Sequence, residues 1–401
     1  MDTIISILTA MLSEAIAPTT AGLAIAVIGL NIHFGYTGLL NFGQAGFMLL
    51  GAYGFAITIK SGQPMWLGIF VGLGAAMVFA LILGAPTLKL RGDYLAIVTI
   101  SAAEIIRFTG RLSVLQDFTG GALGIRSANY RGPFVDLSPF SKDPSDQFTL
   151  MPINYTDFGG SNAVRVAALL VAAALLVGAI VVFRRGRAAL AESGEKRTPT
   201  SSRVIISALS LGAFIALFFA IPLSFPQTGN DGWWLRLVGW SLVVICSLLV
   251  LLLVRSPWGR LLRGVREDED AMRSLGKNVF AIKMQALVIG GVLGALGGMI
   301  YVLPSTVQPD SLGRQVTFLA FTALLLGGAA TIFGPLLGSI LFFSLRIGIR
   351  EAGDAYIPNS IMNSQQADQF AFIVVGVALM LLVIFRPQGI LGDKRELRIN
   401  V

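Results

Sequence analysis

Apolar stretches long enough to cross a lipid bilayer recur along this chain of 401 residues. A membrane-spanning helix needs about 20 predominantly apolar residues. Only 13% of the residues are charged, about half the share in a soluble domain, so a soluble protein of this size could not cover its surface. We therefore expect an all-α polytopic membrane protein with about 10 to 12 transmembrane helices. The expected spans are 19–33, 42–60, 64–88, 93–110, 163–183, 203–221, 233–254, 279–302, 316–331, 334–350 and 369–385. The shorter run 4–17 is expected either to cross at a tilt or to lie at the interface.

The distribution of basic residues predicts the orientation of these spans. Lys and Arg outnumber Asp and Glu by 30 to 22, and the excess lies mainly near 184–203, near 255–278 and in the C-terminal tail. Basic residues favour cytoplasmic loops, so all three segments and the C-terminus are expected inside. The slightly acidic segment 111–162 is expected to be extracytoplasmic. No basic run is interleaved with aromatic residues, so we expect no nucleic-acid partner.

The residues that usually carry chemistry are scarce. The single cysteine, Cys246, and the single histidine, His33, both lie in apolar stretches and are expected to be buried. One cysteine cannot form an intrachain disulfide, and no Cys/His cluster offers a metal site. Since no nucleophile, base and metal ligands cluster either, we expect no catalytic residues, no metal and no enzyme.

Glycines interrupt two apolar stretches, one in each half of the chain. Interrupted helices in the two halves of a transporter often flank the substrate path, whereas single glycines more often serve helix contacts and tight turns. The polar residues Asn31, Asn41 and Gln44 lie near the first break and are expected either to bond unpaired backbone or to line a pathway. The expected breaks contain Gly35, Gly38 and Gly43 in the first stretch, and Gly327, Gly328, Gly334 and Pro335 in the second.

Two further groups of charged residues stand out. Glu104 and Arg107 lie three apart in an expected span, where they are expected either to pair with each other or to serve the substrate path or gate. Near the second basic loop, four consecutive acids precede a stretch that ends at Gly276. Acids suit the first turn of a helix and glycine suits its C-terminal cap, so the loop is expected to hold a short amphipathic helix. The acids are Glu267, Asp268, Glu269 and Asp270.

Seven motifs follow one another along the chain, at Gly29–Phe47, Leu90–Thr99, Glu104–Arg107, Thr119–Gly124, Gly259–Glu269, Leu326–Pro335 and Arg386–Gly392. In this order they resemble the motifs of branched-chain amino acid permeases of ATP-binding-cassette (ABC) importers, in particular the LivM type. The spacing from Asp270 and Ala271 to Gly276 is also similar to the coupling motif of ABC permeases, with Asp in place of Glu and Met in place of the second Ala. Residues 163–221 depart from the pattern and are expected to form an inserted helical hairpin.

The resemblance implies a multi-pass subunit of a bacterial plasma-membrane importer, with one permease domain over 1–401. It implies a second, LivH-like permease, two cytoplasmic ATPases that bind ATP and Mg, and an extracytoplasmic binding protein. The coupling loop 260–278 would seat in a groove of the ATPase. Its coupling residues would be Arg266, Glu267, Asp268, Glu269, Asp270, Ala271 and Gly276. Independently, the chain contains no G-x-x-x-x-G-K-[ST] loop and cannot supply its own nucleotide site.

Three alternatives remain at this stage. The same permease fold could import urea or short amides. A secondary transporter would work without an ATPase, but Glu104 is the only evident proton carrier among the spans. A membrane enzyme is disfavoured by the lack of a catalytic cluster.

Overall fold

The computed structural model describes residues 2–89, 92–141, 143, 146–149, 161–193, 205, 208, 209, 212, 213, 216, 223–357, 363–386 and 388–392. The chain divides into two compact units, each described here by itself. Unit 1 comprises Met1–Thr9 and Gln147–Phe225, and unit 2 comprises Ala10–Asp146 and Pro226–Val401. Most of the expected span 203–221 lies outside the described residues, and so do the basic residues of the C-terminal tail other than Arg386.

The fold is all-α, as predicted, and the described helices coincide closely with the expected spans. Long helices form because the apolar stretches are rich in Ala, Leu and other residues that favour helices, and because backbone polar groups in lipid must bond within the segment. The long helices are α1 (Asp2–Ala15), α2 (Pro18–Leu30), α3 (Gln44–Lys60), α4 (Met65–Thr87), α5 (Gly92–Arg111), α8 (Ser161–Ser193), α10 (Trp233–Arg255), α13 (Val279–Val302), α14 (Arg314–Gly327), α15 (Gly334–Tyr356) and α16 (Ser364–Phe385).

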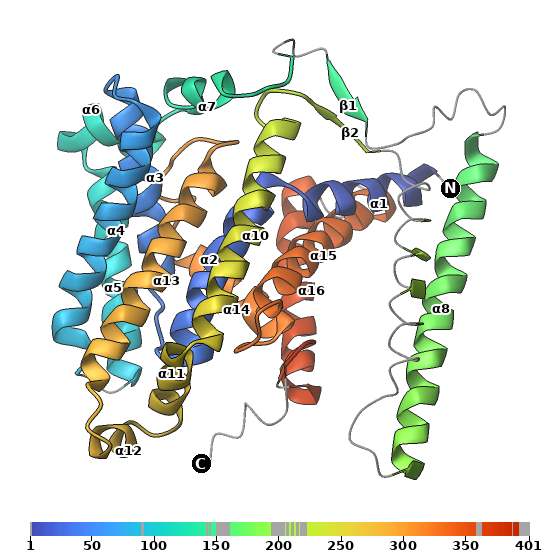
Figure 1. Cartoon of the computed structure of the whole chain (residues 1–401). Helices are drawn as coiled ribbons and strands as arrows, with labels where there is room; N and C mark the ends of the chain where they lie inside the picture. Colours follow the sequence, from blue (N-terminus) through green and yellow to red (C-terminus); the bar gives the residue numbers. More distant parts are fainter. Residues whose placement is uncertain are drawn as a thin grey trace. The chain divides into compact units, whose positions relative to one another are not determined.

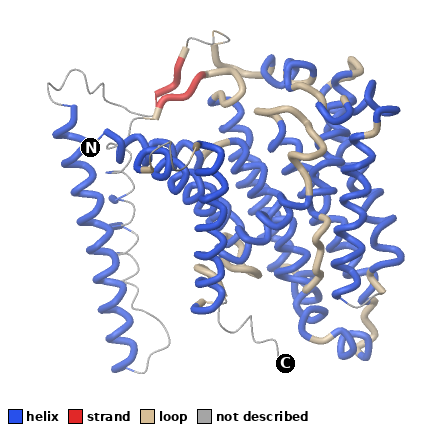
Figure 2. Tube along the Cα trace, turned by 180° about the vertical axis from the view of Figure 1, so that it is seen from behind, coloured by secondary structure: helices blue, strands red, loops and turns tan. Residues whose placement is uncertain are grey.

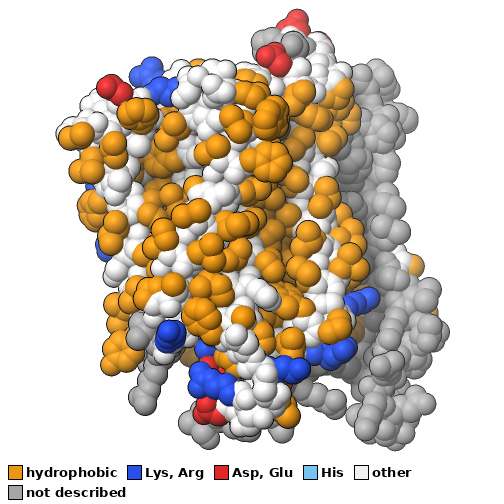
Figure 3. Space-filling model, turned by 60° about the vertical axis from the view of Figure 1, so that its left-hand side comes forward, with side chains coloured by type: hydrophobic (Ala, Val, Ile, Leu, Met, Phe, Trp, Pro, Cys, Tyr) orange, Lys and Arg blue, Asp and Glu red, His pale blue; other side chains and the backbone are white. Residues whose placement is uncertain are grey.

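Within the described residues, six helices are individually long and apolar enough to cross a membrane. They are Pro18–Tyr36, Met65–Thr87, Val166–Arg184, Trp233–Arg255, Val279–Val302 and Ser364–Leu381. The other expected spans there, α3, α5, α14 and α15, are also helical but are shorter or carry more charge. In Figure 3 hydrophobic side chains cover the middle of the molecular surface, and Lys, Arg, Asp and Glu gather towards two opposite edges. The chain is therefore a multi-pass membrane protein.

The centre of unit 2 is α13, which packs against α2, α3 and α4 (Figure 1). Almost every residue of α2 is buried, whereas α4 and α10 bury only about one side each. Glycines let α13 approach its neighbours closely: a side chain at Gly298 would overlap the backbone of Met48 in α3, and one at Gly297 would overlap the backbone of Gly22 in α2. Small residues at such contacts are what helix association in lipid requires.

Unit 2 has two ends, which we name after short helices found there (Figure 1). The α7 end carries α6 (Gln116–Thr119), three 3-10 turns (Ser113–Leu115, Gly121–Leu123 and Ser127–Asn129) and α7 (Gly132–Asp136). The α12 end carries α11 (Pro257–Glu267) and α12 (Glu269–Ser274). Most loops gather at these ends, but loop segments also interrupt the bundle between them (Figure 2).

Tyr130 fastens the α7 end to the core. Its hydroxyl lies 2.6 Å from the carbonyl oxygen of Val302 and 2.8 Å from that of Ser305. Burial raises the pKa of Tyr130 above its ordinary value, so the hydroxyl stays protonated and remains a donor. An antiparallel bridge between Ile125 and Val307 adds a second attachment. The segment after α5 is thus folded onto the end of α13.

Unit 1 contains α8 and a two-stranded sheet formed by β1 (Gln147–Thr149) and β2 (Ser224–Pro226, whose last residue belongs to unit 2). The prediction of a basic loop starting at 184 is wrong for residues 184–193, because α8 continues as a helix to Ser193. Arg, Ala, Leu and Glu in this stretch all favour helix, so a span can extend past the bilayer without a break. The range 163–221 falls within unit 1, and since most of its second half lies outside the described residues, the inserted hairpin stays a prediction.

Candidate functional site

The α12 end presents two short helices joined at Asp268. α11 begins with Pro257 at its first turn and buries Gly259, Leu262 and Val265, while α12 buries Met272. The backbone of Asp268 is extended, which separates the two helices. The sequence predicted only the helix after the acids, because the charged residues of α11 hid its narrow apolar face. The element is thus a bent helical pair rather than one short helix.

Asp268 begins α12 as its N-cap. Its Oδ1 accepts hydrogen bonds of 2.9 Å from the backbone N–H groups of Asp270 and Ala271. Such a cap contributes about 1 kcal/mol, which matters for a helix of six residues. Gly276 has a positive φ of 72°, which glycine adopts without strain, and it ends the turn after α12. The predicted roles of acids at the start and glycine at the end are confirmed for Asp268, Glu269, Asp270 and Gly276, whereas Glu267 is the last residue of α11.

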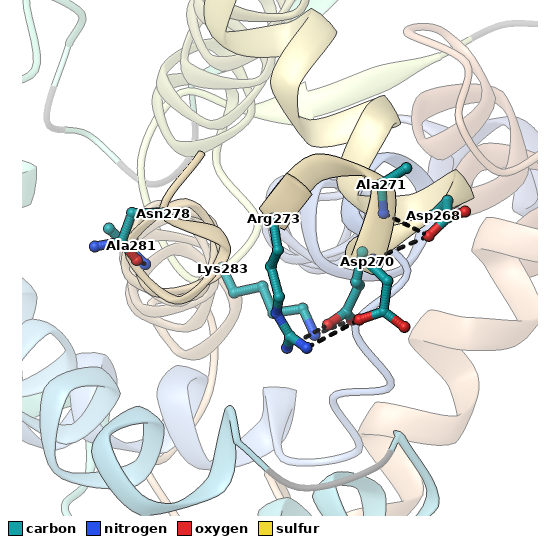
Figure 4. Close-up of polar contacts among 8 residues, drawn as sticks. Asp268, Asp270, Ala271, Arg273, Asn278, Ala281 and Lys283 are labelled. Carbon is teal, nitrogen blue, oxygen red and sulfur yellow. Dashed lines mark hydrogen bonds and ion pairs between the residues drawn. The ribbon is translucent and has the colours of Figure 1, made fainter. Parts of the chain in front are cut away.

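Glu269 and Asp270 form ion pairs within α12, and Glu269 also pairs with α13. The guanidinium of Arg273 lies 3.3 Å from Glu269 and 3.1 Å from Asp270. Glu269 also pairs with Lys283, a buried residue in the first turns of α13. Figure 4 shows Arg273 and Lys283 reaching towards the same group of carboxylates. Because the pair is only partly exposed, α12 is held against the helix at the centre of unit 2.

Arg266 links α11 to the first helix break. Its Nη1 donates a hydrogen bond to the carbonyl oxygen of Gly35. A side chain at Gly38 would lie against the aliphatic part of Arg266, and Arg263 lies 6.0 Å from the ring of Tyr36. The exposed acid Glu267 follows directly. The last turn of α11 therefore contacts the interrupted part of the bundle.

The first break differs in detail from the prediction. The helix does not stop at Phe34 but continues as a π-helix, η1 (Asn31–Tyr36), and only residues 38–43 are non-helical. Gly35 thus lies within η1, Gly38 takes a positive φ of 75°, and Gly43 is the N-cap residue of α3. Such π segments frequently occur at functional sites.

A buried polar network fills this break, and each polar side-chain atom of His33, Asn41 and Gln44 has at least one partner. The amide of Asn41 donates to Nδ1 of His33 at 3.0 Å and to Oε1 of Gln44 at 3.3 Å, and its Oδ1 accepts from the N–H of Gly43 at 2.9 Å. Gln44 donates to the carbonyl oxygens of Ala26 and Gly290. Nε2 of His33 lies 3.2 Å from the carbonyl oxygen of Leu287, which fits a neutral ring protonated at Nε2.

The two breaks meet through Asn31. Its amide donates to the carbonyl oxygen of Thr331 at 2.7 Å, and its Oδ1 accepts from the N–H of Ala330 at 2.9 Å. Asn31, Asn41 and Gln44 therefore all bond backbone groups, which was one of the two roles expected for them. The second break runs from Gly327, the last residue of α14, through Gly328 to Gly334 and Pro335, which begin α15.

Glu104 and Arg107 pair as predicted, with 2.6 Å between Nη2 and Oε2. The sequence did not reveal a third member: Nη1 of Arg107 lies 2.5 Å from Asp310, which Arg111 also approaches at 3.5 Å. Asp310 lies in the polar segment between α13 and α14. A carboxylate is ordinary in such a segment, so the sequence does not indicate that it pairs with Arg107. Buried Lys283 was also missed, although a Lys one turn inside an apolar span is itself a signal for a partner.

Comparison with known proteins gives consistent matches. The family described as "Branched-chain amino acid transport system / permease component" matches residues 13–191 and 160–384. The chain is 27% identical over 382 residues to the high-affinity branched-chain amino acid transport system permease protein LivM of Escherichia coli, covering 95% of this chain and 70% of LivM. It is 26% identical over 245 residues to LivH of the same organism, covering 56% of this chain and 75% of LivH.

A shorter match is to the permease protein BraD of Pseudomonas aeruginosa, at 33% identity over 144 residues, or 36% of this chain and 43% of BraD. No solved structure matches the chain significantly.

Proposed function

Because this chain belongs to the branched-chain amino acid transport system permease family, we propose that it is one permease subunit of an ABC importer for branched-chain amino acids. The match to LivM over 95% of the chain carries this proposal. The weaker match to LivH supports a second, LivH-like permease as the other half of the pore. Two partner ATPases would bind ATP and Mg, and an extracytoplasmic protein would deliver the cargo.

The α11–α12 pair would be the surface that docks on the ATPase. Glu267 and Asp270 are exposed there, while Asp268 and Glu269 are occupied as cap and anchor. Exposed charges on an otherwise anchored helix suit docking into a groove of another protein. This division of labour among four consecutive acids explains why only some of them would contact the partner.

Movement of this pair would reach the bundle by two routes. One route is the ion pair between Glu269 and Lys283 of α13. The other is the hydrogen bond from Arg266 to the carbonyl oxygen of Gly35 in the π-helix. From there, Asn31 connects to the second break. Both breaks interrupt long helices and contain positions with positive φ, Gly38, Gly328 and Ala330. Hinges are commonly loop or element-terminal residues of this kind, which absorb changes in φ and ψ. We infer that the two breaks switch access to the pathway.

The α7 end would face the binding protein, and the α12 end with the C-terminus would face the cytoplasm of a bacterial cell. The six basic residues of 255–278 support this orientation, because the positive-inside rule counts Lys and Arg near the ends of the spans. Glu104 and Arg107 would then lie near the outer entrance, where Asp310 joins α5 to the segment after α13. They remain candidates for a gate at that entrance.

The docking surface is tested by reversing the two exposed acids, E267K/D270K, and by leaving the cap and anchor intact. We expect loss of co-purification with the ATPases encoded by neighbouring genes and loss of ATP-driven leucine uptake in proteoliposomes. The matched control reverses two exposed acids at the α7 end, D117K/D146K, and should keep ATPase binding.

Wild-type ATPase binding and uptake by E267K/D270K would overturn the docking surface. Leucine uptake by this chain alone, unaffected by ATP, would instead identify a secondary transporter. ATP-driven uptake of urea or short amides but not of leucine would keep the fold and change the cargo.

A further inference from the structure

A pocket of about 290 Å³ opens at the α12 end, between the end of α4, α12 and the start of α13. Four basic side chains line it, from three different segments, together with an apolar wall. The basic residues are Lys89, Arg273, Lys277 and Lys283, and the wall includes Leu88 and Phe280.

The pocket keeps a positive excess after its own ion pairs are counted. Glu269 pairs with both Lys283 and Arg273, and Asp270 pairs with Arg273. Lys89 and Lys277 form no ion pair with any side chain that the structure describes. The ammonium group of Lys89 lies 5.9 Å from the centre of the Phe280 ring. Four cations therefore face two carboxylates, and an anion is the complementary ligand.

The surface beside the pocket is apolar. Val78 and Ile82 on α4 are 55% and 67% exposed, and they lie four residues apart on one face of the helix. Lys89 follows Ile82 by seven residues, so it continues this stripe just beyond the end of α4. In Figure 3 the apolar surface is bordered by basic side chains at the lower edge of the view. A ligand with a phosphate head and hydrocarbon chains fits this arrangement.

We propose that the pocket binds the phosphate headgroup of an anionic phospholipid, whose acyl chains lie along the exposed face of α4. Basic pockets at the end of membrane helices recognise such headgroups, and each basic residue adds to the attraction. The site adjoins α12 because Arg273 and Lys283 belong both to the pocket and to the ion pairs that hold α12. A bound headgroup would thus stabilise α12 against α13.

The test uses the purified full chain alone in nanodiscs, so it does not depend on the ATPases. Native mass spectrometry measures lipid retention after release, with phosphatidylglycerol or phosphatidylcholine as the lipid. Wild type should retain phosphatidylglycerol and not phosphatidylcholine, and K89Q/K277Q should lower its affinity about 30-fold. Both lysines are exposed and lack described ion pairs, so the fold should survive.

The matched control R255Q/R260Q removes two exposed charges at the same end but outside the pocket, and it should retain the lipid as wild type does. Equal retention by wild type and K89Q/K277Q would overturn the proposal. So would displacement of the lipid by millimolar inorganic phosphate, which would identify a free-anion site. If K89Q/K277Q kept the lipid but lost ATPase binding in a separate co-purification experiment, the proposal would also fail and the pocket would be a protein contact.

Discussion

At the residue scale, Arg266 connects parts of the chain that are 231 positions apart. Its acceptor is a backbone carbonyl, so only the arginine can be changed by mutation. A hydrogen bond from a charged group contributes about 1.5 to 3 kcal/mol, so R266A should lower leucine uptake about tenfold or more while ATPase binding persists. R266K should retain part of the uptake because an ammonium group can still donate to one carbonyl. Uptake and ATP hydrolysis, measured together in proteoliposomes, give the coupling ratio. A normal ratio in R266A would exclude this link.

Gly298 tests the close approach of α13 and α3. A larger side chain there would overlap the backbone of Met48, so the helices would have to separate. Overpacking a well-packed contact costs about 1 to 3 kcal/mol, and G298L should therefore lower the melting temperature of the detergent-purified protein. Gly74 is the matched control in α4, because a Cβ added there would meet no described atom within 4 Å. Equal melting temperatures for G298L and G74L would contradict the packing described.

Asn31, Asn41 and Gln44 show what sequence reasoning can and cannot supply for single residues. Their polarity inside an apolar stretch predicts that each needs partners, and the structure provides them. Which partners they take depends on helices distant in sequence, such as the Gly290 and Thr331 carbonyls. The same reason hid Asp310 from the sequence, because nothing near it signals Arg107. The local sequence predicts that a buried polar residue needs a partner, but it does not predict which residue that partner is.

At the element scale, α12 depends on its N-cap. D268A should remove the bonds to Asp270 and Ala271 and cost about 1 kcal/mol, which for so short a helix should reduce ATPase binding severalfold. D268N is the matched variant, because asparagine caps a helix as well as aspartate does, and it should bind nearly as wild type. The measurement is an equilibrium titration of permease with purified ATPase. If D268N bound the ATPase as weakly as D268A does, the partner would depend on the carboxylate charge rather than on the helix cap.

The long helices were predictable because hydropathy and length determine a membrane span. The π-helix η1 was not, since its sequence Asn31–Tyr36 looks like an ordinary helix end followed by glycines. Its extra residue per turn is stabilised by contacts with other elements, such as Arg266 on Gly35 and Asn31 on Ala330. The extension of α8 past the apolar stretch was also missed. The charged residues after the stretch suggest the end of the helix, although the helix propensity of this sequence allows α8 to continue to Ser193.

At the scale of the whole molecule, the charge and the packing agree. In unit 2, helices α2 and α13 are buried at the centre, α4 and α10 expose apolar faces, and charged side chains gather towards the two ends (Figure 3). This arrangement follows from the cost of placing charges in a bilayer. Two of the ion pairs among the described residues join separate segments of the chain. Glu269 of α12 pairs with Lys283 of α13, and Arg107 of α5 pairs with Asp310 between α13 and α14.

The orientation of the whole molecule can be measured because Cys246, the chain's only cysteine, is buried. In a C246A background, single cysteines at exposed Ser113 and Ser274 report on the α7 end and the α12 end, respectively. The positive-inside rule predicts that a membrane-impermeant maleimide labels S113C in intact cells made permeable only at the outer membrane. S274C should react only after the inner membrane is opened. Labelling of S274C in intact cells would invert the topology, and the α11–α12 pair could then not meet a cytoplasmic ATPase.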